Sequence, residues 1–377
     1  MTPFTFQTVP NLVFEPGATR EIGALAAVHG RRALLVTDPG VRRAGLTGPA
    51  EASLAAAGVA VTVFDGVEPD PPVAVVEAAV AAGQGTDVVV AVGGGSALDT
   101  AKLAAYLLAS PEPLDALYGV GLAKGRRLPL ILAPTTAGTG SEVTPIAIVT
   151  TGESEKKGVV SDRLLPDWAV LDPDLTLGLP PAVTAATGID AMVHAIEAYT
   201  SRHRKNPLSD QLARQALGLL AGHIRRACAD GGDREARGAM LLGSMLAGMA
   251  FANAPVAAVH ALAYPVGALF HVPHGLSNAL VLGPVLRFNR NAAGTLYGEL
   301  APLVDPGAPA TAEAFVAAMA ALCRDCGVPG SLAAVGIGAG DLDRLAADAM
   351  KQTRLLVNNP REVTLADARA LYTEALG

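Results

Sequence analysis

One aspartate and several histidines have the spacing of a metal site. Asp190 and His194 are four residues apart, which puts them on one face of a helix if residues 188–197 begin a helix. Three more histidines follow in segments that are otherwise apolar: His260, His271 and His274. A carboxylate oxygen and imidazole nitrogens form a mixed site that suits Fe(II), Zn(II) or a similar cation. The alternative is that these histidines are hydrogen-bonded core residues or helix caps.

A run of glycines has the context of a phosphate-binding loop. Residues 93–96, Gly-Gly-Gly-Ser, follow the apolar segment 87–92 and precede residues 97–109, which have a helical pattern. Glycines let the backbone approach a phosphate, and a helix N-terminus offers free N–H groups and the positive end of its dipole. The spacing is not the G-x-G-x-x-G of common dinucleotide folds. A tight turn whose glycines serve packing alone explains the run equally well.

A second loop carries hydroxyl groups and glycines. Residues 134–142 follow the apolar segment 128–133 and include Thr135, Thr136 and Thr139. Their hydroxyls can donate hydrogen bonds to a phosphate, a ribose or a nicotinamide amide. Because the carboxyl ends of parallel strands lie at one edge of a sheet, we expect the two loops to meet there.

Asp38 ends another apolar segment, residues 33–37. A carboxylate at this place can accept hydrogen bonds from a ribose and repel a 2′-phosphate, which favours NAD over NADP. The alternative is an aspartate that only forms the turn before Pro39.

The elements that must position these residues differ between the two halves of the chain. Strands are predicted at residues 33–37, 59–64, 87–92 and 128–133, with helices at 51–57, 73–82 and 97–109. Continuous apolar strands between helices predict a parallel sheet covered on both faces, the doubly wound α/β class. Beyond residue 180 nearly everything has the pattern of helix rich in Ala and Leu. We therefore expect a dinucleotide-binding α/β domain at 1–180 and an all-helical metal-binding domain at 181–377.

Together these motifs resemble the iron-containing (group III) alcohol dehydrogenases. The resemblance begins at residues 11–17 and runs to at least Asn289. It rests on the glycine loop with Asp99 and Lys102, on the second loop, and on the segments 170–197 and 260–278. It implies a dinucleotide-binding α/β domain followed by an all-helical metal domain.

The resemblance also implies roles for single residues. The metal ligands of the family fall on Asp190, His194, His260 and His274. Its cofactor contacts fall on Asp38, Gly94, Gly95, Ser96, Thr135, Thr136, Thr139 and Lys157, the last of which would reach the nicotinamide ribose. Phe251 matches an aromatic position of the substrate cleft. Tyr264 stands where many members have a histidine proposed to carry a proton, which leaves His271 as the remaining nearby imidazole.

The implied activity is that of an NAD(H)-linked alcohol dehydrogenase, or aldehyde or ketone reductase. Hydride would pass between a nicotinamide and an alcohol carbon, with Fe(II), Zn(II) or another divalent cation acting as a Lewis acid. The alternative is an enzyme like maleylacetate reductase or dehydroquinate synthase, which share the wider fold. The presence of Asp190 argues against the former, because that branch tends to lack it. We expect a small or medium neutral alcohol or aldehyde as substrate.

Composition narrows the range of partners. The net charge is −7 and no run of Lys or Arg occurs, which argues against a nucleic-acid partner. The apolar run 240–263 is interrupted by Asn253, Pro255 and His260, so we expect buried helices there and no membrane span. Three cysteines and the absence of signal-peptide features at the N-terminus fit a cytoplasmic enzyme. The resemblance further implies a homodimer or a higher homo-oligomer.

Overall fold

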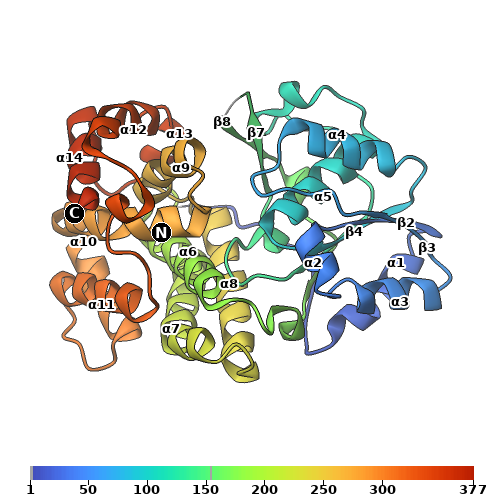
Figure 1. Ribbon diagram of the computed structural model, residues 1–377, viewed down its shortest axis with the longest axis horizontal. Coiled ribbons are helices and arrows are strands. Elements are labelled where there is room, and N and C mark those ends of the chain that lie inside the picture. The colour runs from blue at the N-terminus through green and yellow to red at the C-terminus, as the bar shows by residue number, and fades with distance from the viewer. Residues whose placement is uncertain (1–2, 153–154) are drawn as a thin grey trace. The chain divides into compact units, whose positions relative to one another are not determined.

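The computed structural model describes residues 3–152 and 155–377, which form two compact units (Figure 1). One unit is Gln7–Leu177, drawn from blue to green, and the other is Gly178–Gly377 with the described residues before Gln7. The first has a parallel sheet with helices and the second is helical, so the fold class predicted from the sequence is confirmed. The first unit ends at Leu177, inside the Leu-Gly-Leu-Pro-Pro segment.

Within the described residues, a six-stranded parallel sheet forms the centre of the first unit, in the order β1-β9-β6-β4-β2-β3. The strands are β1 (Asn11–Phe14), β2 (Arg32–Val36), β3 (Ala60–Phe64), β4 (Val88–Gly93), β6 (Leu130–Pro134) and β9 (Trp168–Leu171). The four predicted strands correspond to β2, β3, β4 and β6, with ends that differ by two residues at most. The sequence patterns had not indicated β1 and β9.

Helices cover both faces of this sheet (Figure 1). They are α1 (Ile22–Ala27), α2 (Pro39–Arg43), α3 (Gly48–Ala56), α4 (Val73–Ala82) and α5 (Gly95–Ala109). Ala33 and Leu35 pack with α1 and α3, whereas Leu34 and Val36 pack with α4 and α5. Because successive side chains of a strand point to opposite faces and both faces are buried, every residue of β2 after the exposed Arg32 is apolar.

Among the described residues, a small second sheet combines one short strand that precedes the threonine loop (residues 134–142) with two strands that follow it. It has the order β5-β8-β7, with β5 (Gly119–Val120) parallel to β8 (Glu155–Val160) and β7 (Ile146–Thr151) antiparallel to β8. The sequence patterns had not indicated these strands either.

The helical unit contains the remaining α-helices of the described residues. They are α6 (Pro181–Thr200), α7 (Pro207–Ala229), α8 (Arg234–Asn253), α9 (Ala258–Phe270), α10 (His274–Val304), α11 (Ala312–Asp325), α12 (Leu342–Ala349), α13 (Thr353–Leu356) and α14 (Leu365–Leu376). The prediction that a helix begins at residues 188–197 is wrong, because α6 already begins at Pro181. Proline suits a first helical position, since its missing N–H would have no partner there.

Among the described helices, no single one has the length and apolar character needed to cross a membrane. The bent pair α8 and α9, with 107° between its helices, passes that test by length and composition alone.

Candidate functional site

Helix α6 carries three ionisable side chains on one face. Asp190, His194 and Glu197 follow the spacing i, i+4, i+7, which aligns them along a single helix face. All three are buried. Since a buried charge is costly unless it is paired, this face must meet compensating groups.

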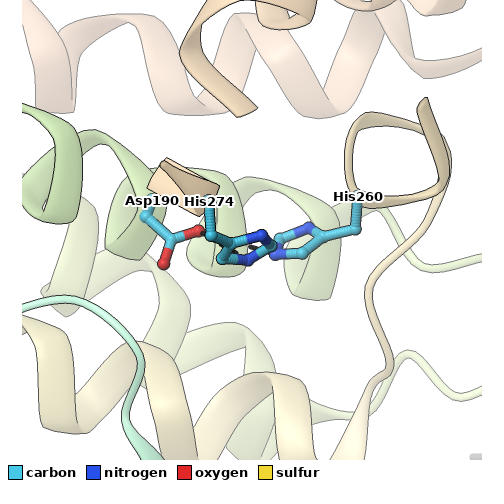
Figure 2. Close-up of side chains that lie close together, drawn as sticks. All are labelled: Asp190, His260 and His274. Atoms are coloured by element: carbon cyan, nitrogen blue, oxygen red, sulfur yellow. Dashed lines mark ion pairs between the residues drawn. The ribbon is translucent and has the colours of Figure 1, made fainter. Parts of the chain in front are cut away.

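Those groups come from α9 and α10 (Figure 2). Figure 2 shows the side chains of Asp190, His260 and His274 pointing toward one another. Asp190 Oδ1 lies 3.6 Å from Nε2 of His260 and 3.6 Å from Nε2 of His274. One ligand atom from each of the three residues lies within 4.8 Å of the others.

His194 stands beside this trio. Its Nε2 lies 3.9 Å from Asp190 Oδ1, and its ring is stacked on that of His260 with centroids 4.7 Å apart. Thus the structure brings all four predicted ligands around one oxygen, although the set whose atoms are all mutually close comprises only Asp190, His260 and His274.

The spacing of these atoms fits a single cation. A tetrahedral ion about 2.1 Å from each ligand holds its ligands about 3.4 Å from one another. The observed distances of 3.6, 3.6 and 3.9 Å from Asp190 Oδ1 are close to that value. One carboxylate and three imidazoles are also a donor set that suits Fe(II) or Zn(II).

Gly275 lets α10 approach α6 at this point. A Cβ atom at Gly275 would lie 2.3 Å from the carbonyl oxygen of Ala186, a distance that no real side chain tolerates. The close approach therefore requires glycine directly after His274, and it brings that imidazole within reach of Asp190.

Glu197 orients His260. Its Oε2 accepts a hydrogen bond from His260 Nδ1 at 2.7 Å and another from the backbone N–H of Ala257 at 2.9 Å. Its Oε1 accepts one from the N–H of Val259 at 2.7 Å. With Nδ1 donating to the carboxylate, Nε2 of His260 is the nitrogen that faces Asp190, an arrangement common around metal-binding histidines.

The charges of the cluster are mutually adjusted. Burial raises the pKa of Asp190, but the imidazoles of His194, His274 and His260 outweigh burial and hold that pKa below its usual value. Burial lowers the pKa of His260, while the carboxylates of Asp190 and Glu197 raise it to about 9. The imidazole of His260 thus carries positive charge beside the buried carboxylates. A divalent cation would take the place of such protons.

The three residues predicted for catalysis lie in different settings. The Phe251 ring is buried and stacked on His194, with centroids 4.2 Å apart. The Tyr264 ring lies 5.8 Å from that of His274. His271 is exposed at the end of α9, with a left-handed φ of 54°. The structure thus brings Phe251 and Tyr264 next to predicted ligands, and it turns the chain at His271.

In the α/β unit the two predicted cofactor loops touch. A Cβ atom at Gly95 would lie 2.7 Å from the Thr139 side chain, and one at Gly94 would lie 3.7 Å from that of Thr136. The N–H of Thr135 donates to the carbonyl of Gly93. Ser96 lies in the first turn of α5, and no described side chain caps the start of that helix. The expected meeting of the two loops is therefore observed.

Asp38 follows the neighbouring strand β2. Its Oδ1 accepts hydrogen bonds from the N–H groups of Gly40 and Val41 and caps α2. A Cβ atom at Gly93 would lie 3.7 Å from Asp38 Oδ2, so this second oxygen points toward the glycine loop. A turn-forming aspartate and a ribose acceptor are thus compatible. Lys157, in β8, lies 3.3 Å from Glu155 and 5.5 Å from the centre of the Tyr118 ring.

A buried lysine connects α5 with the segment that follows the threonine loop. Lys102 of α5 is fully buried, and its Nζ donates to the carbonyl of Ile146 at 2.7 Å and to Thr144 Oγ1 at 3.3 Å. Its Nζ also lies 3.8 Å from Asp99 Oδ1. The helix that begins at the glycine loop is therefore held to the segment that follows the threonine loop.

Two acidic groups accompany this lysine. Asp99 accepts hydrogen bonds from Ser141 Oγ at 2.6 Å and from the N–H of Ile148 at 2.9 Å. Burial lowers the pKa of Lys102 to about 8, although Asp99 and Glu142 oppose that shift. Burial likewise raises the pKa of Glu142 to about 7, against the effects of its own backbone N–H and of Lys102.

Two functional candidates were missed when the sequence was read alone. Glu197 stood inside the predicted motif without a role, although its i+7 spacing from Asp190 puts it on the same helix face. Asn278 follows His274 by one helical turn, and its amide lies within 3.3 Å of both His260 Nε2 and His274 Nε2. In both cases helical spacing from a predicted ligand was the available signal.

A doubly wound unit with two touching loops, and a helical unit with a buried Asp–His cluster, form the architecture expected of a metal-dependent dehydrogenase with a nucleotide-binding domain. Comparisons with known proteins agree. The family model for iron-containing alcohol dehydrogenase matches residues 10–173, and the model for the C-terminal part of the Fe-containing alcohol dehydrogenase family matches residues 184–376. The chain belongs to the iron-containing alcohol dehydrogenase family.

Individual relatives cover nearly the whole chain. Long-chain-alcohol dehydrogenase 1 of Geobacillus thermodenitrificans is 42% identical over 94% of this chain and 91% of its own length. A crystal structure of 1,3-propanediol oxidoreductase has a TM-score of 0.96 at 36% identity, and it covers all of both chains. A sulfoacetaldehyde reductase from Bifidobacterium kashiwanohense, solved in complex with NAD+, has a TM-score of 0.89 at 30% identity over 100% of this chain and 99% of its own. All three are named as oxidoreductases, so the predicted enzyme class is confirmed.

Proposed function

We propose that this enzyme transfers hydride between NAD(H) and a small or medium alcohol or aldehyde, with a divalent cation held by Asp190, His194, His260 and His274. The observation that carries the proposal is the approach of three imidazole Nε2 atoms to within 3.6–3.9 Å of one carboxylate oxygen. Fe(II) is the cation that the family implies, and Zn(II) suits the same donor set. No observation favours the maleylacetate-reductase or dehydroquinate-synthase alternative.

Each residue around the cation has a task of its own. When bound, the cation supplies Lewis-acid chemistry toward the oxygen of an alcohol or a carbonyl. Glu197 keeps Nδ1 of His260 protonated and so turns Nε2 toward Asp190. Phe251 packs on the face of His194, which restricts that ring and excludes water from it. Tyr264 lies near His274, and we propose that it lines the substrate side without accepting the proton, because an unperturbed tyrosine has a pKa of about 10.

For the cofactor, we propose that the glycine and threonine loops bind the phosphates and the nicotinamide side of NAD(H), with Lys157 near the nicotinamide ribose. The NAD+ complex of the related sulfoacetaldehyde reductase supports the choice of cofactor. Asp38 Oδ2 would accept a hydrogen bond from the adenosine ribose and repel a 2′-phosphate. We therefore expect a higher kcat/KM with NAD(H) than with NADP(H), and we expect Asp38→Gly to narrow that difference.

The cofactor test compares both nucleotides with the wild type and with Asp38→Gly. Because Asp38 also caps α2, the variant Asp38→Asn serves as a control that keeps a capping oxygen and removes the charge. If charge repulsion decides the cofactor preference, the ratio of kcat/KM with NADP(H) to kcat/KM with NAD(H) should also rise in Asp38→Asn. A wild-type preference for NADP(H) would contradict the assignment.

A substrate screen tests the function itself. We would follow NADH absorbance with protein loaded with Fe(II), loaded with Zn(II), or stripped by a chelator. The screen includes uncharged alcohols, because two of the relatives are named for a long-chain alcohol and for 1,3-propanediol. Sulfoacetaldehyde supplies an anionic comparison. Turnover that needs no divalent cation, or none with any alcohol or aldehyde, would overturn the proposal.

Two further assignments rest on the sequence: the compartment on the low number of cysteines, and the oligomeric state on the family resemblance. We propose that the enzyme works in the cytoplasm as a homodimer or a higher homo-oligomer. Light scattering of the purified full chain would measure the oligomeric state, and a monomer would contradict it.

A further inference from the structure

Asn278 makes an unusual set of contacts inside the helical unit. Its side chain is fully buried in α10, one turn after His274. Its Nδ2 donates to Asp190 Oδ1 at 2.6 Å and lies 3.3 Å from Nε2 of His260 and 3.3 Å from Nε2 of His274. One amide nitrogen thus contacts one ligand atom from each member of the closest trio in the candidate metal centre.

The other end of this amide is unsupported. Asn278 Oδ1 is buried and has no hydrogen-bond partner among the described residues. Turning the amide over would place this oxygen 2.6 Å from a carboxylate oxygen, where like partial charges repel. A buried amide oxygen without a partner is itself costly, so the donor end must supply the interaction that keeps the side chain in place.

We propose that Asn278 is a positioning residue that fixes Asp190 and thereby sets the affinity of the centre for its cation; this inference rests on the proposed metal site. The bond to Asp190 can coexist with a cation, because a carboxylate oxygen has more than one lone pair. An imidazole nitrogen has only one. The amide can therefore hold Asp190 while a cation is bound, and the two imidazoles stay available to the cation.

The orientation of Asp190 is what this bond controls. The three imidazole Nε2 atoms all lie 3.6–3.9 Å from the same oxygen, Oδ1. Anchoring Oδ1 through Asn278 keeps that oxygen turned toward the imidazoles. Without the amide, the carboxylate is free to rotate about its terminal bond and present its second oxygen. Loss of such an outer partner typically weakens metal affinity about 10- to 100-fold.

The experiment measures cation binding, with no use of turnover. Full-length protein is stripped with a chelator, and the affinity for Zn²⁺ is then determined by competition with a chromophoric chelator. We compare the wild type with Asn278→Ala. A second variant, Asn278→Ser, is used in case the alanine variant does not fold, because the serine hydroxyl can form a hydrogen bond within its own helix. Both should bind Zn²⁺ about 10- to 100-fold more weakly than the wild type.

Asn289→Ala is the matched control. Asn289 is a buried asparagine of the same helix, and it exchanges two amide hydrogen bonds with Asn359, at 2.9 and 2.7 Å. Its loss should lower the melting temperature without changing the affinity for Zn²⁺. This control separates a lost buried amide from a lost contact with Asp190.

Co²⁺ provides a second readout. A carboxylate that rotates and binds through both oxygens changes the coordination of the ion, so the visible absorption of Co²⁺ should change in Asn278→Ala and stay constant in Asn289→Ala. Unchanged affinity in both Asn278 variants would overturn the proposal. Tighter binding would overturn it in another way, by showing that the amide competes with the cation. Failure of the wild type to bind Zn²⁺ or Co²⁺ would instead count against the proposed function.

Discussion

Two groups of buried charges in this molecule differ in where their positive charge comes from. In the helical unit, Asp190 faces imidazole nitrogens that come from α6, α9 and α10. In the α/β unit, Asp99 and Glu142 accompany the buried ammonium of Lys102, which is bonded to Ile146 and Thr144. The first group turns several potential ligands toward one point, and the second carries its cation on its own side chain.

This difference indicates that the group around Asp190 is a binding site, whereas the group around Lys102 stabilises the structure. The inward atoms of the first group can accept a cation from solution, and Glu197 holds one of the imidazoles in the orientation that binding needs. In the second group, hydrogen bonds from Ser141 and Ile148 to Asp99 complete the network. We therefore expect changes in the first group to act on metal content, and changes in the second to act on stability and on the cofactor loops.

The largest effect should come from Asp190→Ala. This change removes the oxygen around which all three imidazoles are arranged. We expect metal to be lost on dialysis and kcat/KM to fall about 1000-fold or more, since a Lewis-acid cation contributes several kcal/mol to catalysis. Elemental analysis measures the metal, and a cation-supplemented assay measures the activity.

His223→Ala is the control for this change. His223 is half-buried in α7, and its Nδ1 lies 2.8 Å from the carbonyl oxygen of Leu219 in the same helix. It should retain metal and activity. Full metal occupancy in Asp190→Ala would show that the cluster is not the metal centre.

Lys102→Met should have the next largest effect, and a different one. It leaves Asp99 and Glu142 buried without their cation, and breaking a buried charge pair in this way costs about 3–5 kcal/mol. We expect a lower melting temperature and a higher KM for NAD(H), with metal content per folded chain unchanged. The double variant with Asp99→Asn should recover part of the stability, because one uncompensated charge is removed. Loss of metal with an unaltered KM would contradict the distinction between the two groups.

The sequence is a good guide where buried strands alternate with helices of clear pattern, whereas β9, a buried strand of four residues, was not indicated. Strands β2, β4 and β6 are buried on both faces, so their apolar runs and the helices between them predicted the sheet. β1 is a short edge strand with exposed residues, and β8 mixes lysines with apolar residues. Neither has a pattern that distinguishes a strand from a loop.

For the candidate metal centre, the sequence shows which residues share a helix face but not which helices pack against that face. The interval from Asp190 to His194 indicates a shared helix face. Nothing in local spacing pairs that face with His260 or His274, whose helices reach it only through tertiary packing such as the close approach at Gly275. Family resemblance supplied that step. His271 and His274 are the same residue type, but the structure exposes His271 at the end of α9 and places His274 beside Asp190.

The smallest expected effect is a change in pH dependence in Glu142→Gln. Burial raises the pKa of Glu142 from 4.5 to about 7. Between these pH values the folded chain keeps a proton that the unfolded chain has released, so this group makes the free energy of unfolding fall as pH rises from about 4.5 to about 7. A glutamine is neutral throughout and lacks this contribution, which is worth at most about 3 kcal/mol. The melting temperature of Glu142→Gln should therefore decline less than that of the wild type between pH 5 and pH 7.

The lowered pKa of Lys102 works in the opposite direction and in another pH range. Burial lowers it from 10.5 to about 8, so between these values the unfolded chain binds more protons and stability rises with pH. Confining the comparison to pH 5–7 therefore isolates the carboxyl group. Metal content, measured on the same samples, should be identical in the two proteins, because Glu142 belongs to the group that carries its own cation. Parallel melting curves across this range would show that Glu142 is ionised in the folded chain as it is in water, and that the buried lysine compensates it completely.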